Sequence, residues 1–110
     1  MYEIVITEHF KKQLKYLLKK NPPLKETLKQ ELLAFNKDQW ISIGKGVYKV
    51  RLKGHSKGKS GGYRLYIFLL EIEGILTPIC IYSKNEKENL NYKELTFHLE
   101  RTKEELKGLL

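Results

Sequence analysis

Basic residues alternate with apolar ones along a short segment of this 110-residue chain. Lys49, Arg51 and Lys53 are separated from one another by single residues, Val50 and Leu52. Every second residue of a β-strand points to the same side, so the three cations would share one face, about 7 Å apart. That spacing is close to the spacing of phosphates along an extended nucleic-acid strand. The pattern therefore predicts a surface that can follow an RNA backbone.

A loop rich in glycine and lysine follows the basic segment, over residues 54–62. It contains Lys57 and Lys59 and leads to Arg64, which is expected to be accessible at the mouth of the loop. The glycines let backbone N–H groups approach an anion closely. A nucleotide-binding P-loop opens a helix, whereas the residues after this loop read as a strand, so that motif is excluded. The guanidinium of Arg64 could hold two phosphoryl oxygens at once.

Most of the net charge of +8 lies in this region: residues 44–64 hold seven basic residues and no acidic one. Charge that serves solubility is usually scattered and mixed in sign, so a concentrated patch favours a polyanionic partner, most often nucleic acid. A metal-dependent nuclease is disfavoured because the segment lacks carboxylates. No metal or other cofactor is expected. The single cysteine, Cys80, excludes an intramolecular disulfide and a multi-cysteine metal site, and it is predicted to be a small buried hydrophobe.

A basic surface of this kind could cleave RNA without a metal. RNA carries its own nucleophile, the 2′-OH, and cleavage needs in-line attack on the adjacent phosphate, stabilisation of the phosphoryl charge and proton transfers. Arginine and lysine can stabilise the charge, and a lysine crowded by other cations has a lowered pKa that suits a base. Neighbouring tyrosines could stack on bases, although Tyr48 and Tyr63 are expected mainly in the core. Charge alone fits RNA binding as well as RNA cleavage.

The remaining sequence predicts one α+β domain over residues 1–110, with the order β-α-α-β-β-β-α. After a first strand over residues 2–6, Thr7 caps a helix, and Asn21 caps a second helix, with which the first forms a hairpin. Ser83–Glu86 fits a capping box ahead of a last helix. The two N-terminal helices are expected over residues 8–20 and 22–36, and the other strands of an antiparallel sheet over 46–53, 62–70 and 75–82.

No apolar run approaches the roughly 18 residues that a membrane-spanning helix needs. The N-terminus lacks a basic region followed by an apolar stretch and a small-residue cleavage site, so it does not read as a secretory signal. A cytoplasmic protein without a membrane partner is expected.

The order and spacing of these motifs resemble the RelE/ParE toxin superfamily, and within it the HigB-like toxins. The similar stretches lie at residues 7–14, 48–52, 57–64 and 81–87 and so cover most of the chain. The resemblance implies a microbial-RNase-like fold, with two helices packed on an antiparallel-dominated sheet and a C-terminal helix. It also implies the toxin of a type II toxin–antitoxin system, an mRNA interferase that cleaves mRNA in the ribosomal A site. The implied partners are mRNA on the ribosome and a helix-turn-helix, HigA-like antitoxin.

Position by position, the resemblance and the basic patch together mark two groups of candidate residues. The catalytic candidates are Arg64, Arg51, Lys84, Lys87 and Tyr82, and the candidates for RNA or ribosome contact are Lys49, Lys53, Lys57 and Lys59. The general acid stays open among Lys84, Lys87 and Tyr92, because the C-terminal Arg or Tyr of the relatives has no clear counterpart here. Two other functions also stay open: a ParE-like inhibitor of DNA gyrase, and a non-catalytic module that binds RNA or the ribosome.

Overall fold

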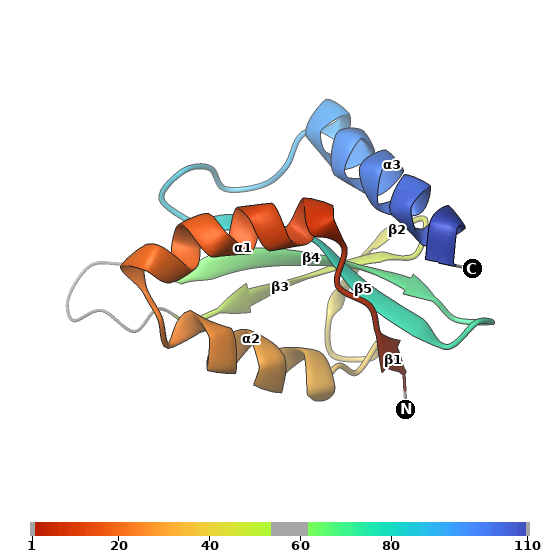
Figure 1. Cartoon of the computed structure of the whole chain (residues 1–110), viewed down its shortest axis with the longest axis horizontal. Coiled ribbons are helices and arrows are strands. Elements are labelled where there is room, and N and C mark those ends of the chain that lie inside the picture. The colour runs from red at the N-terminus through yellow and green to blue at the C-terminus, as the bar shows by residue number, and fades with distance from the viewer. Residues whose placement is uncertain (1, 54–61, 110) are drawn as a thin grey trace.

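A single sheet organises the computed structural model, which describes residues 2–53 and 62–109 (Figure 1). Within these residues the sheet has five strands in the order β1-β5-β4-β3-β2. The class is α+β, as predicted. The strands are β1 (Glu3–Ile4), β2 (Ile41–Gly44), β3 (Val47–Leu52), β4 (Tyr63–Leu70) and β5 (Ile75–Ser83), and the helices are α1 (Glu8–Lys20), α2 (Leu24–Leu33) and α3 (Tyr92–Leu109).

Helices cover both faces of the sheet, and β4 shows why. Its side chains alternate between two cores, with Leu65 and Ile67 on one side and Tyr66 and Phe68 on the other. The first core is closed by α1 and α2, and the second by α3. A strand that is buried on both faces has no solvent-facing positions, which explains the nearly continuous apolar run of β4. Cys80 on β5 is buried in the second core, as predicted.

Two features of the sheet differ from the prediction. The first strand covers only Glu3–Ile4 and pairs with β5 in parallel, so the sheet is mixed rather than wholly antiparallel. The edge strand β2 was not predicted, because all four of its residues are exposed and none alternates between core and solvent. Pro78 on β5 lies opposite Ile67, where the register between β4 and β5 shifts. An irregular site of this kind tolerates the missing N–H of proline.

The helix boundaries follow from their caps. Thr7 accepts a hydrogen bond from the amide of Phe10 at 3.1 Å and caps α1, as predicted. Asn21 does not cap α2, which begins later, after Pro23; instead its side chain donates to the hydroxyl of Tyr63 at 3.0 Å. The predicted capping box at residues 83–86 is a turn in the structure. The capping box of α3 lies at Asn91 and Glu94, whose side chains and backbone amides bond reciprocally at 2.8 and 2.9 Å.

The C-terminal part of α3 is joined to the start of α1. The carboxylate of Glu105 accepts hydrogen bonds from the backbone amides of Glu8 and His9 at 2.7 and 2.9 Å, so it supplies acceptors to amides that have no partner inside the helix. The imidazole of His98 lies 2.8 Å from that of His9. Burial lowers the pKa of His98 to about 4, and it also lowers the pKa of His9, which faces Arg101 as well as Glu105.

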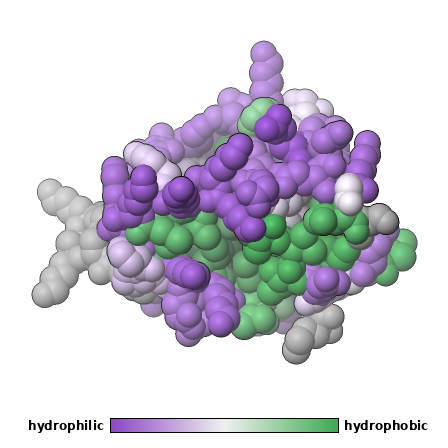
Figure 2. Space-filling model, in the orientation of Figure 1, coloured by the Kyte–Doolittle hydropathy of each residue, from purple (hydrophilic) through white to green (hydrophobic). Residues whose placement is uncertain are grey.

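Figure 2 shows the face that carries α1 and α2, where an apolar band runs between the two helices toward β1 and hydrophilic residues surround it. Part of this band is a groove of about 220 Å³ lined by Tyr2, Ile4, Leu32, Leu33 and Phe35. The groove lies over the first core and not over the basic strand face described below. Within residues 2–53 and 62–109, no helix is long and apolar enough to cross a bilayer.

Candidate RNA-binding and catalytic site

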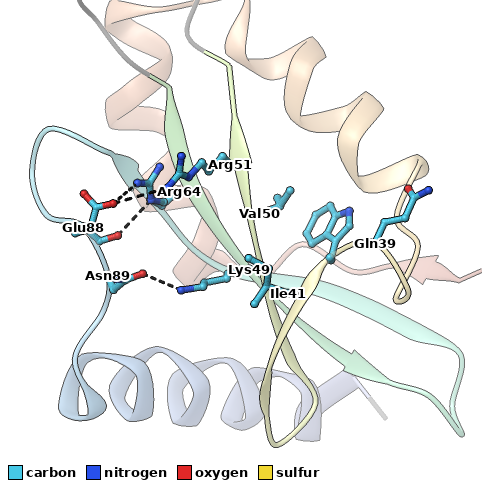
Figure 3. A pocket seen from close by; sticks show the side chains of 9 residues that line it. Gln39, Ile41, Lys49, Val50, Arg51, Arg64, Glu88 and Asn89 are labelled. Atoms are coloured by element: carbon cyan, nitrogen blue, oxygen red, sulfur yellow. Dashed lines mark hydrogen bonds and ion pairs between the residues drawn. The ribbon is translucent and has the colours of Figure 1, made fainter.

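Three cations from two neighbouring strands line one pocket, and we call Lys49, Arg51 and Arg64 the cation row. Arg51 on β3 and Arg64 on β4 are direct partners in the strand register, and Lys49 is two residues from Arg51 on the same face. The pocket has a volume of about 340 Å³, and Gln39 and Trp40 also line it. Figure 3 shows Gln39 on the opposite side of β3 from Glu88. The predicted shared face is therefore confirmed for Lys49 and Arg51, whereas Lys53 lies just beyond the end of β3. Like charges opposite each other in a sheet are destabilising, so this arrangement needs an anion.

That anion comes from residues 84–91, which link β5 to α3 and which we call the strap. Glu88 places a carboxylate oxygen 2.8 Å from Nη2 of Arg64 and 3.9 Å from Nη2 of Arg51. The backbone carbonyl of Glu88 accepts a second hydrogen bond, from Nε of Arg64, at 3.2 Å. The side-chain oxygen of Asn89 accepts from Nζ of Lys49 at 2.9 Å. Every member of the cation row is thus in contact with the strap (Figure 3).

The two partners in the central ion pair differ in their exposure. Arg64 is only 6% exposed, whereas the side chain of Glu88 is 72% exposed. The expectation that Arg64 is freely accessible is therefore wrong for this conformation, because the strap covers its guanidinium. The strand position that fixes the base of Arg64 is as predicted.

A second group of candidates lies beside the row, around the end of β5. Lys87 forms an ion pair with Glu94, and its Nζ lies 6.0 Å from the centre of the Tyr82 ring. The hydrogen bond to Glu94 raises the pKa of Lys87, so this lysine stays an ammonium ion that can bind an anion but releases its proton less readily than a free lysine. Tyr82 is buried, and burial together with its contact to the Tyr66 hydroxyl, at 3.5 Å, raises its pKa. Tyr82 therefore serves as a neutral phenol.

The other candidates lie apart from the pocket or outside the described residues. Lys53 is exposed just beyond β3, and Lys84 is exposed just beyond β5, where its backbone amide donates to the carbonyl of Gly62 at 3.1 Å. Tyr92 is 72% exposed and lies over Lys45, in a different pocket from the cation row. Among the three candidates for the general acid, Tyr92 is thus the one least associated with Arg64. Lys57 and Lys59 lie outside the described residues.

Sequence reasoning missed Glu88 and Asn89. The only signal was the presence of a carboxylate and an amide shortly after β5, in a segment without periodicity. Their role depends on the path of the strap back over β3 and β4, which no local pattern encodes. Trp40 and Gln39 were missed in the same way, because they enter the pocket from the turn before β2.

The comparison with family models agrees with the fold. The model that matches this chain is described as the RelE toxin of the RelE/RelB toxin–antitoxin system, and it matches residues 5–108. No curated protein matches the chain. The match runs from before α1 into the end of α3 and includes all of β2 to β5, the strap and the cation row. The chain belongs to the RelE toxin family of toxin–antitoxin systems.

Proposed function

We propose that this toxin is a ribosome-dependent endoribonuclease of the HigB-like type, which cleaves mRNA in the ribosomal A site. The observation that carries the proposal is the convergence of Lys49, Arg51 and Arg64 on one pocket, with two arginines directly opposite each other. Such an arrangement costs stability unless an anion lies between the cations. A site that concentrates positive charge in this way is suited to a phosphodiester.

The reaction that fits is attack of the RNA 2′-oxygen on the adjacent phosphorus. A new bond forms between the 2′-oxygen and phosphorus while the proton of the 2′-hydroxyl passes to a base, for which a water molecule is sufficient. The bond to the 5′-oxygen breaks, and the products are a 2′,3′-cyclic phosphate and a 5′-hydroxyl. Negative charge develops on the non-bridging oxygens during this step, and fixed cations that face those oxygens stabilise it. Arg64 is the strongest candidate for this role, because its guanidinium is planar and its base is held in the central strand β4.

The leaving 5′-oxygen needs a proton. Lys87 is our candidate donor, because it is protonated at neutral pH and lies beside Tyr82. Its ion pair with Glu94 raises its pKa, so proton transfer requires that this pair opens when RNA binds. Lys84 remains a second candidate for the acid, and Tyr82 contributes a buried, neutral phenol next to this group. Lys49 and Lys53 extend the basic face along β3 and would contact flanking phosphates or ribosomal RNA.

As a member of a toxin–antitoxin family, the chain is expected to be controlled by an antitoxin. We propose a partner of the HigA type, with a helix-turn-helix domain and an acidic surface that matches the net charge of +8. Such a partner could cover the cation row or prevent the toxin from entering the ribosome.

Primer extension on an mRNA that is being translated tests the function. The purified toxin should produce discrete cuts in A-site codons when ribosomes are present and no cuts on the same mRNA without ribosomes. Lys29→Ala removes one exposed cation from α2, away from the pocket, and serves as the control variant, which should cut the mRNA as the wild type does. Absence of cuts together with loss of gyrase supercoiling activity would instead indicate a ParE-like toxin. Absence of both effects, with RNA binding retained, would indicate a binding module.

A further inference from the structure

The strap offers a further inference, which concerns the group that occupies the site before RNA arrives. Arg64 is almost fully buried, and it directs Nη2 to the carboxylate and Nε to the backbone carbonyl of the same residue, Glu88. The pocket between Glu88 and the strands β3 and β4 has a volume of about 340 Å³. The only carboxylate that lines it is that of Glu88, within the part of the chain that the structure describes.

A carboxylate presents to a guanidinium much of what a phosphodiester presents. Both carry one negative charge over two oxygens of similar separation, and both accept parallel hydrogen bonds from arginine. In the free protein, Glu88 therefore satisfies the same donors that the transition state of RNA cleavage would need. It also lies within 4 Å of Arg51, so its single negative charge is shared between both arginines of the cation row.

The exchange of one anion for the other is favoured by the unequal exposure of the two partners. A buried guanidinium without an anion is strongly unfavourable, so Arg64 does not release Glu88 into water without a replacement. The carboxylate of Glu88, in contrast, is mostly solvated already, and it can turn away at little desolvation cost. This arrangement thus favours replacement of the Glu88 carboxylate by an incoming phosphate at Arg64.

We propose that Glu88 is a specificity-determining residue that occupies the phosphoryl-binding position of Arg64 and must be displaced by RNA. The proposal rests on the proposed function, since it concerns the same pocket. It has a direct consequence for substrate choice. Free RNA must compete with a carboxylate that is tethered in place and so has a high effective concentration, whereas the ribosome holds mRNA against the site and offsets that advantage. Glu88 would then be one reason why the toxin spares free RNA.

The first experiment measures binding and does not depend on cleavage. The probe is a short single-stranded RNA with 2′-O-methyl groups, which lacks the nucleophile. Glu88→Gln keeps the size of the side chain and removes its charge, and we expect it to bind this RNA about tenfold more tightly than the wild type, in line with the energy of one hydrogen bond to a charged group. The matched control is Glu86→Gln, which removes the same charge from an exposed strap residue that does not contact the cation row.

A Glu88→Gln variant that binds no more tightly than Glu86→Gln would overturn the proposal, even if the wild-type toxin cleaves mRNA. Conversely, absence of cleavage by every variant would refute the proposed function and leave the binding result intact. The second experiment is single-turnover cleavage of unmodified free RNA and of mRNA on programmed ribosomes. Glu88→Gln should raise the rate on free RNA and retain cleavage on ribosomes. A loss of ribosomal cleavage of 100-fold or more would show that Glu88 is needed as a base, and it too would overturn the proposal.

Discussion

Replacement of Arg64 by alanine should separate activity from stability more clearly than any other change in this protein. The substitution removes two hydrogen bonds to Glu88, at 2.8 and 3.2 Å, from a side chain that is 6% exposed. The remaining partner is solvated, because Glu88 is 72% exposed, so no buried charge is left unpaired. We therefore expect a loss of about 1–2 kcal/mol of unfolding free energy. For a domain of this size that corresponds to a decrease in Tm of roughly 5–10 °C.

The effect on catalysis should be larger than the effect on stability. Loss of one fixed donor to the developing phosphoryl charge typically costs about 100- to 1,000-fold in rate, or about 2.7–4 kcal/mol. Arg64→Lys should recover only part of the rate, because a lysine restores the charge and not the planar pair of donors. The matched control is Arg101→Ala, which removes the third arginine of the chain, on the exposed side of α3. The assay is single-turnover cleavage on programmed ribosomes, at a temperature where far-UV circular dichroism shows all variants folded. A folded Arg64→Ala variant that cleaves within about threefold of the wild type would refute the reasoning.

Three further predictions follow from the fold and the site. The slope of log K against log salt concentration for RNA binding should become about two units shallower when all three residues of the cation row are changed to alanine. The control variant, with alanine at Lys15, Lys19 and Lys29, should change this slope less. Equal slopes for the two variants would mean that RNA binds elsewhere. The free energy of unfolding should fall between about pH 6.5 and pH 4, because the unfolded chain protonates its histidines there while folded His98 stays neutral to a pKa of about 4. After allowance for solvent screening we expect a loss of about 1–2 kcal/mol. Urea titrations of His98→Gln should show a smaller loss between pH 7 and pH 4, because His9 still has a lowered pKa there; an equal loss in variant and wild type would contradict this assignment. Expression of the wild-type toxin without an antitoxin should arrest the growth of a sensitive bacterial host, and normal growth would count against toxin function.

The sequence was informative wherever a residue's role depends on its neighbours in the chain. The periodicity of α1 and the Thr7 cap are local signals, and both were predicted correctly. The shared face of Lys49 and Arg51 was also predictable, because alternation along one strand fixes it. The strand expected over residues 62–70 was also predictable from local sequence, because burial of β4 on both faces makes its residues almost continuously apolar.

The parts that sequence reasoning missed depend on contacts between distant segments. Parallel pairing of β1 with β5 brings Glu3 opposite Ile75, and nothing in a two-residue strand specifies its direction. Glu88 can cover Arg64 only because the chain returns to the sheet 24 positions later. A loop without periodicity carries no signal for such a return, so the cations were predictable and their internal anion was not.

The junction of Glu105 with the start of α1 has a consequence for the timing of folding during synthesis. The first helix of this toxin begins at Glu8, yet two of its leading amides obtain their acceptors from a residue that is translated 97 positions later. At typical bacterial elongation rates of about 5–20 residues per second, that interval is roughly 5–20 s. Once the N-terminal segment leaves the ribosome, it lacks its final partner for the rest of this interval, and the last contacts of the fold form only when α3 emerges. The nascent chain therefore passes through a period in which it is exposed to capture or degradation before it can act as a toxin.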